Sequence, residues 1–267
     1  MTLNIVNAAR ARGVDFTADI YPYIISGGGL SMYVPGWAHE GGEARMMERL
    51  ADPAERLRMK PKVEEMLHFR DWSQLILYQL KSSKYKKFKG ETVKQIADEL
   101  QLDPMDVAFD IMLEEGTSVP FMGLFGLEED IRTLMRHEAV MFGSDGTALE
   151  ASGDTGKEST HPRNYGTFPR VLQKYVGEGV LTLPEAVHKM TGMPAWRLGL
   201  TERGILRPGA YADLAIFDPY RVNDNYTITE PPKYPEGIPY VIVNGSIVVE
   251  NSKHTGALTG EILHKPV

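Results

Sequence analysis

Apolar side chains recur at helix-compatible spacing between residues 3 and 9, and Gly13 follows as a natural stop because glycine readily adopts a left-handed backbone. Residues 14–21 (VDFTADIY) then predict a buried strand, which ends at Pro22. The glycines at 27–29 predict a loop in which the backbone could approach a ligand closely. This first stretch therefore predicts a helix, a strand and a glycine-rich loop.

Residues 43–115 have the pattern of an inserted helical region. Asp103 followed by Pro104 is typical of a helix N-cap and a proline in the first turn. Gly116 follows the apolar run VAFDIMLEE and predicts the end of that helix. We expect this region to cover other parts of the fold.

A second short apolar run, residues 139–144 (AVMFGS), is typical of a parallel strand. It is closed by Asp-Gly, and a long polar loop is predicted over residues 145–164. Helical patterns resume over 167–176 and again over 183–188, where Thr182 is the expected cap.

The last part of the chain changes to a strand pattern. Residues 212–217 alternate weakly, and residues 240–243 and 247–249 flank the pair Asn244-Gly245, which is the strongest short hairpin signal. The proline-rich stretch 229–239 is interpreted as a rigid loop. A small β domain is therefore predicted at this end.

Composition narrows the class of function. Of 267 residues, 42% are hydrophobic and 24% charged, which is ordinary for a globular protein, and the net charge of −7 without a long basic run argues against nucleic-acid binding. The absence of cysteine excludes disulfides, thiol nucleophiles and cysteine metal ligands. No stretch approaches the roughly 20 apolar residues that a membrane span needs. We expect a cytoplasmic protein that acts on a small molecule.

Two polar residues near the 139–144 strand are candidates for chemistry. Asp145 lies at its carboxyl end, where barrel enzymes place catalytic side chains, although Asp-Gly can equally make a simple turn. Arg163 could bind a carboxylate with both arms of its guanidinium, or be an ordinary solvated arginine. Asp19, Tyr21 and Tyr23 could likewise point polar groups toward a barrel mouth, although core packing is the commoner role of a tyrosine.

Histidine spacing gives no local zinc motif, because neither H-x-H nor H-E-x-x-H occurs. The seven histidines are His39, His68, His137, His161, His188, His254 and His264. Three of them, His68, His137 and His188, fall in predicted helical segments and are interpreted as surface or core residues. A nucleophile elbow, a P-loop and a dinucleotide fingerprint are also absent.

Several strings nevertheless resemble one known family. They are ADIYPY (18–23), GSDG (143–146), HPRNYGTFPRVL (161–172), RPGAYADLAIFD (207–218) and YPEGIPYVIVNGSIVVENSKHTG (234–256). Together they resemble the D-aminoacylase, or N-acyl-D-amino-acid deacylase, branch of the amidohydrolase superfamily. The PG-x-x-ADL element marks only the broad superfamily, whereas HPR-x-YGTFPRVL and YP-x-GI-x-YV-x-VNG are specific to the branch.

The resemblance implies an α/β fold: the C-terminal part of a (βα)8 TIM barrel with a helical insertion, plus a small β-sandwich or β-barrel domain. The barrel part would be residues 1–200, with the insertion at about 30–130, and the β domain would be residues 201–267.

The implied activity is hydrolysis of an N-acyl-D-amino acid to a D-amino acid and a carboxylate by zinc-activated water. Asp145 would be the general base and then the general acid, and a possible metal ligand. Arg163 would bind the substrate α-carboxylate, and Tyr21 would line the same pocket. Ser26, followed here by Gly27 where the family carries adjacent serines, is the remaining candidate for substrate binding.

The family's other metal ligands lie on earlier strands and match nothing in this sequence. We therefore expect a truncated part that lacks metal ligands and is inactive in isolation, with unpaired strand edges. Its partner would be the missing N-terminal half or further copies of the chain. The alternatives are a cyclic amidohydrolase of the dihydroorotase or hydantoinase kind, and a non-catalytic fragment.

Overall fold

A computed structural model describes residues 2–67, 71–124, 126–150, 160–225 and 233–264. The helices are α1 (Thr2–Ala11), α2 (Glu43–Ala51), α3 (Pro53–Leu67), α4 (Val93–Leu100), α5 (Pro104–Glu115), α6 (Glu128–Arg136), α7 (Arg163–Arg170), α8 (Leu183–Met190) and α9 (Gly192–Leu198). The strands are β1 (Ala18–Ile20), β2 (Ile25–Gly29), β3 (Leu75–Leu77), β4 (Pro120–Leu124), β5 (Val140–Phe142), β6 (Leu214–Ile216), β7 (Tyr240–Val243), β8 (Ser246–Glu250) and β9 (Lys253–His254). The predicted α/β class is confirmed.

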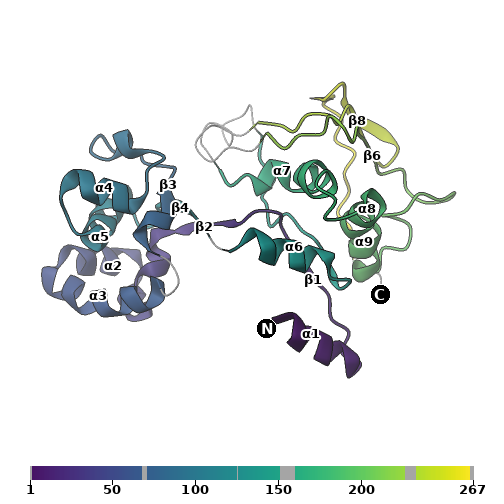
Figure 1. The fold of residues 1–267 in the computed structure, drawn as a ribbon. Helices are drawn as coiled ribbons and strands as arrows, with labels where there is room; N and C mark the ends of the chain where they lie inside the picture. Colours follow the sequence, from purple (N-terminus) through teal and green to yellow (C-terminus); the bar gives the residue numbers. More distant parts are fainter. Residues whose placement is uncertain (1, 68–70, 125, 151–159, 226–232, 265–267) are drawn as a thin grey trace.

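The sheets among the described residues are small. Strands β1 and β5 form a parallel pair, β2-β4-β3 an antiparallel sheet, and β6-β7-β8-β9 a second antiparallel sheet. Figure 1 shows α2 to α5 gathered with β3 and β4, and β2 running from them toward the remaining elements. We call α2 to α5 with β3 and β4 the helical group.

The β1–β5 pair positions the candidate site. Ala18 pairs with Val140 and Ile20 with Phe142, so both strands end at the same edge. The strand predicted over 14–21 is much shorter than expected, and Val14 is exposed. The reason is that β5 has only three residues, and among the described strands β1 pairs with no other.

The helical group has its own apolar core, which includes the fully buried Leu50, Met59 and Ile111. Asp103 caps α5 as predicted: its side chain accepts hydrogen bonds from the next two free backbone N–H groups, each at 3.1 Å. Gly116 ends the helix at φ 95°. These local signals were sufficient to predict both ends of α5, because capping depends only on neighbouring residues.

The prediction of a loop at residues 27–29 was wrong. All three glycines belong to β2 and pair with β4. A Cβ at Gly28 would collide with the Met32 sulfur and lie 3.2 Å from the Phe121 ring. The glycines therefore allow side chains to pack against the strand, and the partner strand lies about a hundred residues away in sequence.

Helix α7 begins at Arg163, earlier than the predicted 167–176, and continues into a π-helical segment, Val171–Val176. The predicted cap of α8 is confirmed, because Thr182 and Glu185 form a reciprocal capping box. The loop expected over 145–164 is partly outside the described residues, and its last two residues are helical.

The C-terminal strands form a hairpin as predicted. Asn244 and Gly245 have φ of 49° and 78°, which the two-residue turn between β7 and β8 requires. Among the described residues these strands belong to one four-stranded sheet rather than to two facing sheets. The first part of the proline-rich stretch, and His68, lie outside the described residues.

Helix α1 stands apart from the other elements in Figure 1. It is tied to them by Arg10, which donates to the Phe16 carbonyl at 2.8 Å and pairs with Glu138 at 2.9 Å. Asn7 contacts His137 Nε2 at 2.7 Å. None of the helices in the described ranges combines the length and apolar character needed to cross a membrane.

Candidate active site

Asp145 lies three residues beyond β5, with its side chain 68% exposed. Its φ is 46°, a left-handed conformation that aspartate tolerates better than most residues. Ser144 supports the turn, because its hydroxyl accepts a hydrogen bond from the Gly146 N–H at 3.2 Å. The carboxylate is thus presented at the edge where β1 and β5 both end.

Asn164 holds this turn against α7, a role that no sequence motif predicts. Its amide oxygen accepts from the Thr147 N–H at 2.7 Å, and its amide nitrogen donates to the Thr160 hydroxyl at 2.8 Å. A Cβ at Gly146 would lie 3.0 Å from that amide oxygen, so the turn packs directly on the helix. Asp145 is therefore held close to the start of α7.

Arg163, the first residue of α7, is brought next to Asp145. Its Nη1 lies 3.2 Å from Asp145 Oδ2, and its guanidinium lies 5.1 Å from the centre of the Tyr21 ring. Its side chain is only 20% exposed, so it is not a solvated loop arginine. Within the described residues its buried Nε has no hydrogen-bond partner. Because this Nε is buried, a ligand in the pocket would meet the terminal Nη atoms of the guanidinium instead.

His161 is a buried, neutral histidine beneath this pair. Its Nε2 donates to the Ile25 carbonyl at 3.0 Å, and its Nδ1 accepts from the Arg163 N–H at 3.1 Å, a tautomer assigned from these partners. Burial lowers its pKa to about 4, and the charge of Arg163 acts in the same direction. Because both ring nitrogens are engaged, His161 orients the site rather than reacting in it.

Arg163 lines a pocket of about 470 Å³. Its described lining residues are Gly27, Gly28, Gly29, Ser31, Tyr78, Ser118, Pro120, Thr147, Thr160, His161, Arg163 and Asn164. They come from β2 and the residue Ser31 after it, from β4 and residues next to β3 and β4, from the turn after β5, and from the start of α7. Arg163 is the charged residue among them, since the histidine is neutral, so an anion is the ligand that this described lining favours.

The other predicted site residues have different places. Tyr21 contacts Arg163 and also the His161 ring, at 5.6 Å between ring centres. Ser26 pairs with Gly123 in the β2–β4 ladder and is not among the described lining residues. Asp19 is exposed on β1. The structure therefore brings together Asp145, Arg163 and Tyr21, with Ser26 one residue before the pocket wall.

A buried polar cluster holds the segment that carries Tyr21. The Asp224 carboxylate accepts from the Tyr23 hydroxyl at 3.1 Å and from Arg170 at 3.2 Å. Arg170 also donates to the Pro22 carbonyl at 2.8 Å. Tyr23 is thus a core residue, and the cluster fixes the chain after β1 against α7.

The described residues do not fit a metal site. No three of their histidine, aspartate or glutamate side chains come close enough to hold an ion. Asp145 offers one carboxylate, and His161 has no free nitrogen beside it.

Comparison with known protein families identifies the family of this chain. Residues 91–249 match the model of the amidohydrolase family. The chain belongs to the amidohydrolase family. The predicted resemblance is confirmed by relatives from Alcaligenes xylosoxydans xylosoxydans. An N-acyl-D-aspartate deacylase is 35% identical over 183 residues, 68% of this chain and 34% of that protein. An N-acyl-D-glutamate deacylase is 31% identical over 249 residues, 92% of this chain and 41% of that protein.

Solved amidohydrolase structures agree with these relatives. A D-aminoacylase mutant in complex with CuCl2 has a TM-score of 0.71 at 29% identity, covering 98% of this chain and 45% of that one. An N-acyl-D-glutamate deacylase from Bordetella bronchiseptica, complexed with zinc and a phosphonate inhibitor, has a TM-score of 0.66 at 29% identity, covering 92% and 42%. A dihydroorotase from Ligilactobacillus salivarius is 37% identical over only 94 residues. The chain thus spans less than half the length of each of these relatives.

Proposed function

We propose that the Arg163 pocket binds an N-acyl-D-amino acid and that the site serves its hydrolysis to a D-amino acid and a carboxylate. The observation that carries the proposal is that Arg163, which lines this pocket, pairs with Asp145 at 3.2 Å. A carboxylate-binding cation is thereby next to an exposed carboxylate that can move protons. The names of the relatives supply the substrate class.

Each residue has a distinct role in this proposal. Arg163 lines the pocket and binds the substrate α-carboxylate, because a guanidinium can donate two parallel hydrogen bonds to a carboxylate. Tyr21 supports the guanidinium with its ring face. Asp145 takes a proton from the attacking water and passes it to the leaving amine. Ser26, one residue before the pocket wall, is proposed to contact the substrate.

The wider architecture is also part of the proposal. Residues 1–200 would form part of a (βα)8 barrel, interrupted at about 30–130, and residues 201–267 a separate β domain of sandwich or barrel type. The parallel β1–β5 pair and the coverage of solved relatives support the barrel. Zinc is the cofactor we propose for the complete site, and it would supply an acidified water. Its ligands would come from outside the described residues.

A cyclic amidohydrolase is the second candidate, favoured by the shorter dihydroorotase match. A cyclic amide such as dihydroorotate also carries a carboxylate that Arg163 could bind. The two candidates separate on a substrate panel, because only the second predicts ring opening of dihydroorotate or hydantoins. A non-catalytic fragment would turn over neither class.

The test is release of D-amino acid from N-acetyl-D-amino acids with zinc present. The chain is assayed alone and after co-expression with the part of D-aminoacylase that lies outside the matched segment. We expect D-specific release in the co-expressed preparation, and a loss of about 100-fold or more in kcat for Asp145→Asn, because a general acid–base group contributes that much. Absence of release in both preparations, or an unchanged kcat in Asp145→Asn, would contradict the proposal.

A further inference from the structure

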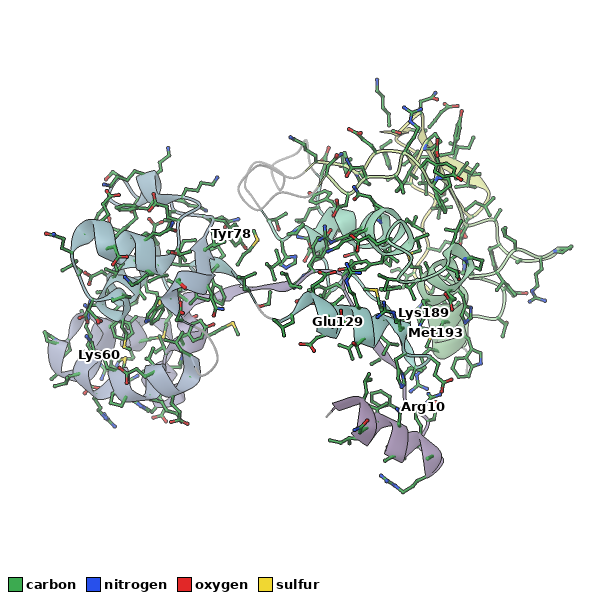
Figure 2. The ribbon with its side chains drawn as sticks, in the orientation of Figure 1. Arg10, Lys60, Tyr78, Glu129, Lys189 and Met193 are labelled. Atoms are coloured by element: carbon green, nitrogen blue, oxygen red, sulfur yellow. The ribbon has the colours of Figure 1, made fainter. Side chains whose placement is uncertain are left out.

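Tyr78 lines the same pocket as Arg163 but comes from a distant part of the chain. It directly follows β3, whose Leu75 and Leu77 are fully buried, so its backbone is fixed by the core of the helical group. Figure 2 labels Tyr78 on the side of the helical group that faces the remaining elements. Its ring packs with Ile25 and Met122, and 9% of the residue is exposed. The side chain is therefore held in one position.

The Tyr78 hydroxyl makes no hydrogen bond with any residue in the described parts of the chain. It lines the same pocket as Arg163. It is also not one of the buried unpaired side-chain atoms, so the oxygen is accessible to a ligand in the pocket. Burial raises the pKa of Tyr78, and the charge of Arg163 opposes part of that rise. The hydroxyl thus keeps its proton at neutral pH and can donate it in a hydrogen bond.

Two residues with donors of complementary kinds line one cavity. Arg163 offers charged N–H groups and Tyr78 a neutral O–H, and a carboxylate has enough lone pairs to accept from both. We propose that Tyr78 is a substrate-binding residue, whose hydroxyl donates a hydrogen bond to the carboxylate held by Arg163. This inference rests on the proposed function for the identity of the ligand. It makes the helical group a direct contributor to the site.

The experiment compares Tyr78→Phe with the unaltered chain by isothermal titration calorimetry. The probes are N-acetyl-D-alanine, its uncharged amide N-acetyl-D-alaninamide, the L enantiomer of the acid, and N-acetylglycine as an achiral carboxylate. Tyr220→Phe is the matched control, because Tyr220 is 96% exposed and lies outside the pocket. Circular dichroism verifies that each variant is folded.

We expect Tyr78→Phe to bind N-acetyl-D-alanine and N-acetylglycine about tenfold more weakly, because a hydrogen bond to a charged group is lost. Binding of the amide, and all binding by Tyr220→Phe, should be unchanged. Unchanged acid binding in Tyr78→Phe, an equal loss for acid and amide, or no carboxylate binding by the unaltered chain would overturn the role of Tyr78. A selective loss for both acids without any preference for the D enantiomer would instead support Tyr78 and count against the proposed function.

Discussion

Replacing His161 by glutamine should change how the stability of the protein depends on pH. His161 is 4% exposed, and burial lowers its pKa from the usual 6.5 to about 4. Between these two values the unfolded chain binds a proton that the folded chain does not, so stability falls as pH is lowered. The contribution of His161 is therefore complete above pH 6.5 and is lost progressively toward pH 4.

The magnitude follows from the size of the shift. Each unit of pKa difference corresponds to about 1.4 kcal/mol, so a shift from 6.5 to about 4 gives a loss of about 3 kcal/mol across that window. Glutamine keeps a donor for the Ile25 carbonyl but takes up no proton in this range. The variant is expected to be less stable at pH 7.5, and its disadvantage should shrink by about 3 kcal/mol as pH falls to 4.

The assay is the free energy of unfolding from urea titrations at several pH values between 4 and 7.5. His188→Gln is the matched control, because His188 is exposed on α8 and its ring meets solvent in both states. NMR titration of the His161 ring gives an independent reading of the same proton. A difference in unfolding free energy between the unaltered chain and His161→Gln that stays constant with pH would contradict the lowered pKa of His161.

Two further substitutions test how the site is supported. The buried Lys189 ammonium (Figure 2) donates to the His137 and Val140 carbonyls at 2.6 and 2.7 Å. Lys189→Met should therefore cost about 1–3 kcal/mol of unfolding free energy, measured by urea titration, because both carbonyls lose their donor. An unchanged free energy of unfolding would contradict that role. Gly166→Ala should weaken both stability and N-acetylglycine binding, since the new Cβ would collide with the Tyr23 hydroxyl and lie 3.0 Å from the Asp224 Cβ. The matched Gly36→Ala should leave ligand binding unchanged, because no atom of the described residues lies within 4 Å of its Cβ position and its φ is not positive.

Local features of this fold could be predicted from short stretches of sequence. The caps at Asp103 and Thr182 and the turn at Asn244-Gly245 depend on side chains and backbone angles within a few residues. The same holds for the position of Asp145 just after β5. Arg163 was predicted in a loop, whereas it is the first residue of α7.

Features that depend on distant partners could not be predicted in the same way. Residues 27–29 look like a loop until β4 is available to pair with them. The burial of His161 depends on the Ile25 carbonyl, and the position of Tyr78 depends on a separate core in the helical group. A sequence pattern carries little information about such contacts, because their partners are far apart along the chain.

In the proposed function, Arg163 and its pocket select the carboxylate of an N-acyl-D-amino acid. The most direct measurement is the affinity of the chain for N-acetyl-D-alanine and N-acetyl-L-alanine, before and after Arg163→Gln. We expect N-acetyl-D-alanine to bind more tightly than its L enantiomer, and Arg163→Gln to lose that binding. Equal affinity for the two enantiomers, unaffected by Arg163→Gln, would contradict it.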